Sequence, residues 1–153
     1  LNNQTQTPCA YIPIVFQNGI NRNPFMTQLQ RKFVWVYDVV TIVQKPLALR
    51  LAAGIIKVLG KIPSAPYAVH GSLFVMNGAA LKKTGAAIFN EDTFLYCEEM
   101  EFAEVLRQAQ IPLETCSIEV RHIGKVSTGK VTSTLADFIR VWLPSWKNWR
   151  ARW

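Results

Sequence analysis

Residues 93–102, TFLYCEEMEF, join an apolar, aromatic run to a cluster of carboxylates. The pattern after this run predicts a helix from about residue 98 to residue 110, with Phe102 and Leu106 on its inner face. Pro112 follows the end of this helix, where proline is common. The acidic side chains are therefore expected at the start of a helix that packs against the rest of the domain.

The segments on either side of this helix set the fold class. Residues 72–76, SLFVM, have the composition of a buried strand, and residues 79–84 predict a short helix that ends at Gly85. Residues 118–122 alternate as a strand, and residues 134–142 begin a final amphipathic helix. Strands and helices that alternate in this order predict an α/β fold.

The first part of the chain is harder to interpret. Residues 10–16, AYIPIVF, predict a short strand, and Pro13 would place it at a sheet edge or at a strand end. The Asn18-Gly19 pair marks a turn. Residues 33–43 fit either a strand or a buried helix, because their apolar run has no decisive period.

A further helix is predicted for residues 46–59. Pro46 suits the first helical position, and Gly60 suits a stop. One apolar stripe along this helix consists of Leu47, Leu51, Ile55 and Leu59. We expect this stripe to pack against the domain, and contact with a membrane is the alternative.

The composition indicates a basic globular protein. Half of the 153 residues are hydrophobic and the net charge is +7, yet six of the ten acids lie within residues 91–104, which hold no base. No run of 18 apolar residues is present, so no transmembrane helix is predicted. The three cysteines have no metal-finger or C-x-x-C spacing, which predicts free thiols in the cytoplasm.

Two of the clustered acids are candidates for proton transfer. Glu98 and Glu99 fall in the first turn of the predicted helix, where negative charge is stabilised by about 0.3–1 kcal/mol. A purely structural explanation is that the acids are solvated residues of a helix start, with Glu104 paired to Arg107. The chemical explanation is that the apolar run before them desolvates Glu98 or Glu99, which raises a carboxylate pKa and suits it to general-base work.

A second candidate group surrounds the end of the strand at residues 118–122. His122 ends this strand, although a single histidine is more often structural than a ligand. The loop at residues 124–130, GKVSTGK, supplies donors that suit phosphate oxygens, among them Lys125, Ser127 and Lys130.

Six short motifs follow one another between residues 71 and 130. They are Gly71-Ser72-Leu73-Phe74-Val75, Leu81-Lys82-Lys83-Thr84-Gly85, Phe89-Asn90-Glu91, residues 93–102, Leu106-Arg107 and Val120-Arg121-His122. In this order and spacing, they resemble the C-terminal part of the family 2 inverting glycosyltransferases. The resemblance implies the later half of a GT-A fold, a mixed sheet flanked by helices, over residues 1–133. Residues 134–153 would follow as an amphipathic helix or tail.

The resemblance also implies roles for single residues. Glu99 takes the place of the catalytic base and Glu98 that of the acid before it, and the glutamate at the usual aspartate position leaves either as the base. His122 matches a histidine that helps to hold a divalent metal, Mg²⁺ or Mn²⁺. The donor-binding side of the site would contain Gly71, Ser72, Lys125, Ser127 and Lys130.

The family's Asp-x-Asp metal motif does not occur in this sequence, whose three aspartates are Asp38, Asp92 and Asp137. We therefore expect the nucleotide-binding half, with most of the metal ligands, to precede Leu1. The 153 residues alone would then be inactive.

The resemblance implies transfer of a sugar, with inversion, from a nucleotide-sugar to a hydroxyl of a glycan or lipid-linked acceptor, as in the synthesis of bacterial surface polysaccharide. The alternatives are a catalytically incomplete transferase half and a basic, aromatic module that binds anionic lipid. Nucleic acid is not an expected partner, because the sequence lacks helix-turn-helix, zinc-finger and RNP-like motifs.

The C-terminus is rich in tryptophan and basic residues. Four of the five tryptophans lie in the last twelve residues, and Pro144 would kink this segment or start a second helix. The aromatic stripe consists of Trp142, Trp146, Trp149 and Trp153. Either it packs against the domain, or the tail lies in a membrane interface and holds the protein at the inner face of the cytoplasmic membrane.

Overall fold

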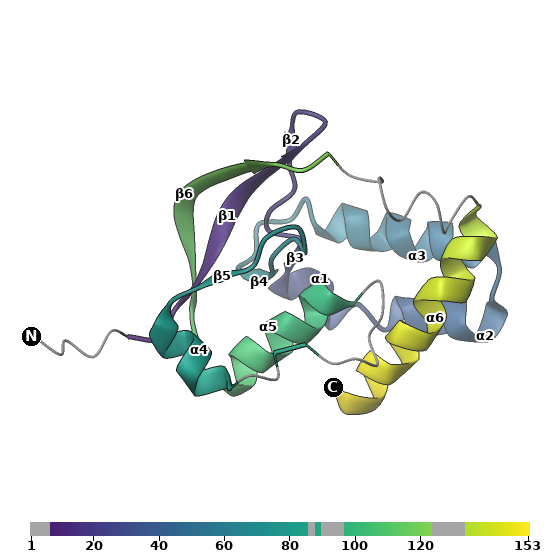
Figure 1. The fold of residues 1–153 in the computed structure, drawn as a ribbon. Coiled ribbons are helices and arrows are strands. Elements are labelled where there is room, and N and C mark those ends of the chain that lie inside the picture. The colour runs from purple at the N-terminus through teal and green to yellow at the C-terminus, as the bar shows by residue number, and fades with distance from the viewer. Residues whose placement is uncertain (1–6, 86–87, 90–96, 124–133) are drawn as a thin grey trace, which may run out of the picture.

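A computed structural model describes residues 7–85, 88–89, 97–123 and 134–153 of the chain. These residues form a mixed sheet with helices packed around it, so the predicted α/β class is confirmed (Figure 1). Most of the helical mass lies to one side of the sheet, and the short helix α4 (Gly78–Thr84) lies near the opposite end of the molecule.

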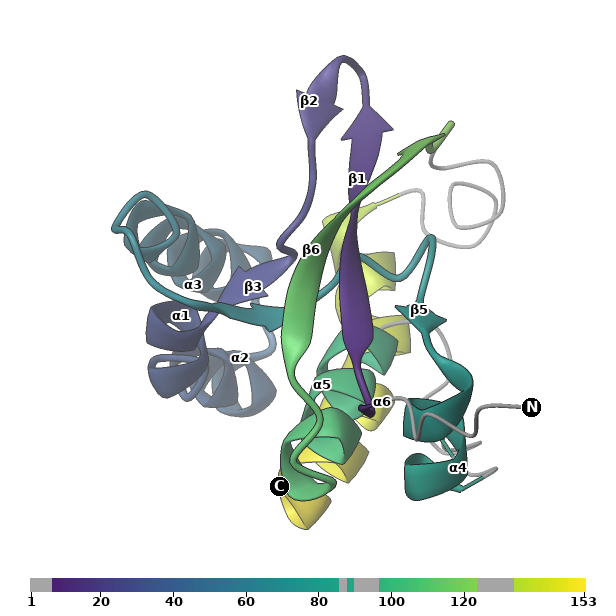
Figure 2. The same cartoon turned by 90° about the vertical axis from the view of Figure 1, so that its left-hand side faces the viewer.

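The sheet is built around strand β1 (Ala10–Gln17). Strand β6 (Leu113–Arg121) runs parallel to β1 along one edge, from the Ala10–Leu113 pair to the Phe16–Arg121 pair (Figure 2). Two short antiparallel strands, β2 (Ile20–Asn21) and β5 (Val75–Met76), pair with the two ends of β1. The sequence placed the first strand correctly, and its Asn18-Gly19 turn is present with both residues at positive φ, 53° and 75°.

Pro13 lies inside β1 and not at a strand end. On the side away from β6, β5 and β2 pair only with residues 10–11 and 16–17, so no described strand pairs with Pro13 there, and the β1–β6 register shifts between Ile12 and Ile14. Proline is tolerated at such a bulge because its missing N–H is not needed there. The Pro13 carbonyl accepts a hydrogen bond of 2.8 Å from the side chain of Asn23.

A small second sheet connects a group of three helices to the rest of the structure. Strands β3 (Met26–Thr27) and β4 (Pro66–Ala68) pair with each other, and the chain between them forms α1 (Gln28–Lys32), α2 (Val36–Val43) and α3 (Pro46–Leu59). Residues 33–43, which fitted either element from sequence, are therefore mostly helical. The predicted limits of α3 are confirmed, with Pro46 in the first turn and Gly60 as the C-cap.

The face that α3 buries differs from the prediction. The buried side chains are Leu49, Ala52 and Ile56. Leu47, Leu51 and Ile55 of the expected stripe are 65%, 61% and 46% exposed. Because α3 is apolar on both sides, its period could not indicate which side packs against the domain.

Helix α5 (Glu98–Gln108) lies between two hydrophobic cores. On one side, Phe102 and Leu106 pack with Ala10 and Ile12 of β1. On the other side, Met100 and Ala103 belong to a larger core made mostly of helices. Because α5 packs under the sheet and also against the helical core, its N-terminal end lies between these two cores.

The C-terminal segment is a single helix, α6 (Leu135–Arg152), which continues through Pro144. Thr134 caps its start, in a capping box with Asp137. Trp142, Trp146 and Trp149 are 6%, 1% and 0% exposed in the helical core. The stripe thus packs against the domain, and a membrane contact through these rings would require α6 to leave the core. None of the helices in the described ranges has the length and apolar character needed to cross a membrane.

Candidate active site

The candidate site lies at the start of α5. Cys97, just before the helix, has a left-handed backbone with φ 74°, and Glu98 and Glu99 begin the first turn as predicted. The N-terminal end of a helix stabilises negative charge. Both carboxylates are half-buried, so they lie at the boundary between core and solvent.

The other two acids of α5 have structural roles. Glu104 is 1% exposed and accepts hydrogen bonds from Arg31, Tyr67 and Arg107, with Tyr67 at 2.7 Å and the two arginines at 2.6 Å. The pairing of Glu104 with Arg107 confirms the prediction. Glu101 is 3% exposed and accepts hydrogen bonds from Arg152 and Trp153 of the C-terminal helix region. The acidic cluster therefore contains both buried ion-pair partners and the two candidate bases.

The Glu99 carboxylate is held by a backbone N–H from a distant segment. Its Oε1 accepts a hydrogen bond of 3.2 Å from the nitrogen of Gly71. A Cβ atom at position 71 would lie only 2.6 Å from this oxygen and 3.0 Å from the carboxyl carbon. Glycine is thus required at position 71 for the carboxylate to approach the backbone this closely.

The surroundings of Glu99 raise its pKa. Burial is the largest cause, and the neighbouring Glu98 carboxylate acts in the same direction. The backbone N–H groups of Glu99 and Gly71 partly offset this rise because they stabilise the charged form. A carboxylate with a raised pKa is a better proton acceptor than an ordinary surface glutamate.

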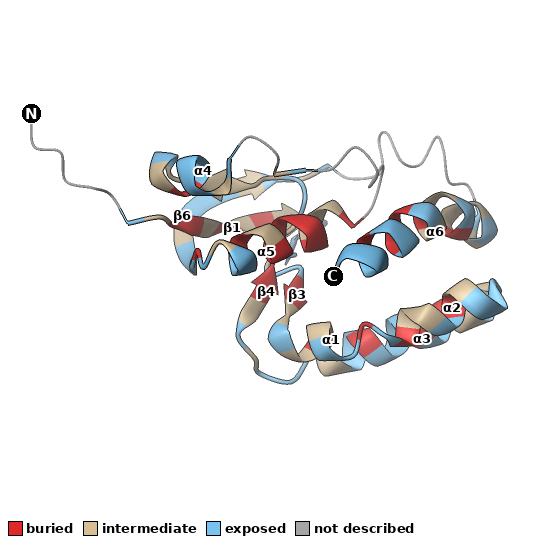
Figure 3. Ribbon diagram, turned by 90° about the horizontal axis from the view of Figure 1, so that it is seen from below, coloured by how far each residue is buried: buried red, intermediate tan, exposed pale blue. Residues whose placement is uncertain are grey.

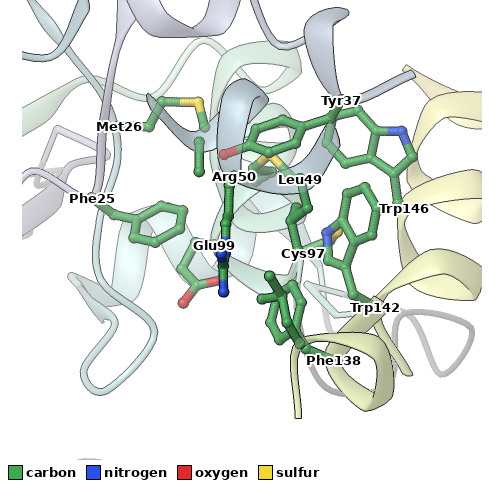
Figure 4. Close-up of a pocket in the computed structure, with 13 residues that line it drawn as sticks. Phe25, Met26, Tyr37, Leu49, Arg50, Cys97, Glu99, Phe138, Trp142 and Trp146 are labelled. Carbon is green, nitrogen blue, oxygen red and sulfur yellow. The ribbon is translucent and has the colours of Figure 1, made fainter. Parts of the chain in front are cut away.

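Glu99 also lines an apolar cavity of about 520 Å³ between α3, α5 and α6 (Figure 4). Among its described lining residues, Glu99 and Arg50 are the only charged ones. The other lining residues are apolar or aromatic, including Phe25, Tyr37, Phe138 and Trp142. A pocket of this size and character can hold the apolar part of a ligand beside one acid and one base. Glu98 does not contribute to the described lining.

Ser72 and two histidines extend the site along the other side of Gly71. Nδ1 of His70 lies 3.0 Å from the Ser72 hydroxyl and accepts a hydrogen bond from the Ser72 nitrogen at 3.2 Å. The rings of His70 and His122 have centroids 5.3 Å apart. Burial, followed by the nearby His122 and Arg22, lowers the pKa of His70, so this imidazole is neutral at pH 7.

The described residues do not complete a metal site. No cluster of three or more His, Cys, Asp or Glu side chains in this part of the chain is arranged to hold an ion. His122 and His70 offer at most two nitrogen ligands, whereas Mg²⁺ prefers several oxygen ligands. The metal role expected for His122 thus depends on ligands from elsewhere.

Most of the site residues predicted from sequence lie in one region. Gly71 and Glu99 are in direct contact, and Ser72 is next to Gly71. The ring of His122 lies beside the ring of His70, which in turn contacts Ser72. Lys125, Ser127 and Lys130 lie outside the described residues. His122 lines a separate cavity of about 770 Å³ at the end of β6, and not the cavity of Glu99.

Sequence reasoning did not single out His70 and Arg50 as site residues. His70 immediately precedes the Gly71-Ser72 pair, so its place next to a predicted motif was an available signal. Arg50 lies on α3, and no local pattern indicated that it would line the same cavity as Glu99.

Comparisons of this chain with protein-family models, with curated proteins and with solved structures give no match.

Proposed function

We propose that this chain is the acceptor and catalytic-base part of an inverting glycosyltransferase with a GT-A type fold. Its donor would be a nucleotide-sugar, and its acceptor a hydroxyl of a glycan or lipid-linked molecule. The observation that carries the proposal is the Glu99 carboxylate, fixed by Gly71 at the wall of an apolar cavity. The motif order described for residues 71–130 supports the same conclusion.

In this proposal, Glu99 is the general base. An acceptor hydroxyl next to the Glu99 carboxylate gives up its proton to Glu99 as the hydroxyl oxygen attacks the anomeric carbon. The bond from that carbon to the diphosphate oxygen breaks in the same displacement, which inverts the configuration. The raised pKa of Glu99 increases its affinity for the proton that it must accept.

The residues that line the cavity indicate which kind of acceptor it would bind. A lining with only one acid and one base among its described residues favours an acceptor that has an apolar portion. Arg50 lines the same cavity as Glu99 and would pair with an anionic group of the acceptor, such as a phosphate (Figure 4). A lipid-linked acceptor has both features, so we favour it over a free polysaccharide.

The donor side would be formed partly by Gly71 and Ser72, whose hydroxyl contacts the neutral His70. Lys125, Ser127 and Lys130 are proposed to contact the diphosphate. A divalent metal, Mg²⁺ or Mn²⁺, would supply neutralisation of the leaving diphosphate, with most ligands from an upstream half and His122 as one contributor. We place this reaction in the cytoplasm, in the synthesis of bacterial surface polysaccharide.

The test is to incubate the complete protein with a panel of nucleotide-sugars and polyprenyl-phosphate-linked acceptors, and to assign the product by NMR. We expect one glycosidic product whose anomeric configuration is opposite to that of the donor. Retention of configuration, or no transfer from any donor although the nucleotide binds, would contradict the proposal. In the second case, the catalytically incomplete half remains, and the absence of an Asp-x-Asp motif upstream in the gene would agree with it.

A further inference from the structure

Helices α2 and α3 carry an exposed apolar face on the side away from the core. Figure 3 shows the two helices side by side, with exposed positions along their outer surface. Eight large apolar side chains on this face are between 45% and 81% exposed: Trp35, Val39, Ile42, Val43, Leu47, Leu51, Ile55 and Val58. We call these eight residues the α2–α3 face. So many exposed apolar side chains on adjacent helices mark an interaction surface.

The α2–α3 face is continuous across the two helices. A groove of about 480 Å³ runs between them and is lined by Trp35, Val39, Val43, Leu47, Leu51 and Ile55 of this face. Lys45, at the turn between the helices, is the only charged residue in its described lining. The surface is therefore one apolar strip with a cation at its end.

The charges around the α2–α3 face have one sign. Lys45, Lys57 and Lys61 are exposed, and the sequence contains no acid between Asp38 and Glu91. Asp38 lies on α2, but its carboxylate is paired with Arg150 of α6 at 2.8 Å. Exposed lysines beside an apolar strip are complementary to a membrane surface, in which anionic headgroups lie above apolar acyl chains.

We propose that the α2–α3 face lies in the interface of a bilayer that contains anionic lipid. Helix α3 has 14 residues and is therefore about 21 Å long, which is too short for a hydrocarbon core of about 30 Å. The helices lie in the plane of the membrane, with their aliphatic side chains among the acyl chains and the lysines at the phosphates. Trp35 lies at headgroup depth, where its ring and N–H are both accommodated.

A second copy of the chain fits this surface less well. A two-fold dimer would place the α2–α3 face of both partners together, so the lysines beside it in one copy would lie near the identical lysines of the other. Anionic headgroups attract these three lysines at once. Charge complementarity therefore selects lipid over self-association.

This membrane contact differs from one through the C-terminal tryptophans. Trp146 and Trp149 are buried in the core, whereas the α2–α3 face is exposed without any rearrangement. The contact also does not depend on Glu99, so it can be tested separately from sugar transfer.

The test is co-sedimentation of the full chain with vesicles of phosphatidylcholine, with and without 30 mol% phosphatidylglycerol. Ile42→Asp combined with Leu47→Asp places two charges at side chains that are 81% and 65% exposed, so folding is retained, as circular dichroism will check. We expect the wild-type chain to bind the anionic vesicles. The double variant should bind about 100-fold more weakly, because each inserted aliphatic side chain contributes about tenfold.

The matched control is Ile20→Asp combined with Ile123→Asp, at side chains that are 57% and 81% exposed on other parts of the surface. It should bind vesicles as the wild type does, and Glu99→Gln should do the same. Lys45→Glu with Lys57→Glu should weaken binding to anionic vesicles at low salt by more than tenfold. Wild-type chain that stays in the supernatant, equal loss in the control, or a dimer that the Ile42/Leu47 variant dissociates would overturn the proposal.

Discussion

Replacing Gly71 with alanine tests whether the position of the Glu99 carboxylate matters for catalysis. The new Cβ would lie 2.6 Å from Oε1, whereas ordinary contact begins near 3.4 Å, so the carboxylate must retreat by roughly 0.8 Å. A misplacement of about 1 Å at a reacting group can cost about 100-fold in rate. We therefore expect kcat for sugar transfer in the complete protein to fall between about 10-fold and 100-fold.

The pH profile provides a second readout for the same variant. The Gly71 N–H lowers the pKa of Glu99, so its loss raises that pKa further above the ordinary value. A general base works only when deprotonated, so the acid limb of kcat/KM should move to higher pH. The variant should accordingly recover part of its activity as the pH increases.

The control is Gly78→Ala, because a Cβ at Gly78 meets nothing within 4 Å and its φ is ordinary. This variant should retain the wild-type rate and pH profile. If Gly71→Ala also retains both, the contact between Gly71 and Glu99 has no role in transfer, and the reasoning is refuted.

Three further predictions concern stability. Glu104→Gln should lower the free energy of unfolding in urea by about 3–5 kcal/mol at pH 7, because it leaves the half-buried Arg31 without its counter-charge. Burial alone would raise the pKa of Glu104, but hydrogen bonds from Arg107, Tyr67 and Arg31 lower it overall. The difference between wild type and this variant should therefore begin to shrink as the pH falls below the ordinary glutamate pKa. It should vanish only once the pH has passed the lowered pKa of Glu104, where the wild-type carboxylate is protonated as well; a difference that grows at low pH would contradict this. Trp146→Ala should cost about 3–5 kcal/mol in the same assay, since Trp146 is 1% exposed, and removal of residues 142–153 should abolish the cooperative transition.

The helix limits could be predicted because they depend on local chemistry. Pro46 and Gly60 bound α3 as expected, and Glu98 begins α5. The packed face of α3 could not be predicted, since Leu47 and Leu49 are equally apolar and only the tertiary structure decides which is buried. The sequence left Pro13 at either an edge or a strand end, because the partners of a strand and a bulge in its pairing cannot be recognised from that strand alone.

The candidate site was predictable where short motifs carried it. Glu99 and Gly71 are 28 residues apart, and the motif order placed both in one site, where they are in contact. Arg50 and His70 have no motif of their own, so only the fold brings them to this region. The Trp stripe was ambiguous because aromatic residues with interleaved cations suit both a core and a membrane interface, and burial against α2 and α3 decided between them.

The central claim is that Glu99 is the base of a glycosyl transfer. The most direct measurement is the transfer rate of Glu99→Gln in the complete protein, alongside nucleotide-sugar affinity and the matched variant Glu98→Gln. Glutamine keeps the size of the side chain but cannot accept the proton, so we expect transfer to be abolished while the affinity stays near that of the wild type. Glu98→Gln, whose side chain lies outside the described cavity lining, should keep most of the activity. If Glu99→Gln retains more than about a tenth of the wild-type rate, Glu99 is not the base.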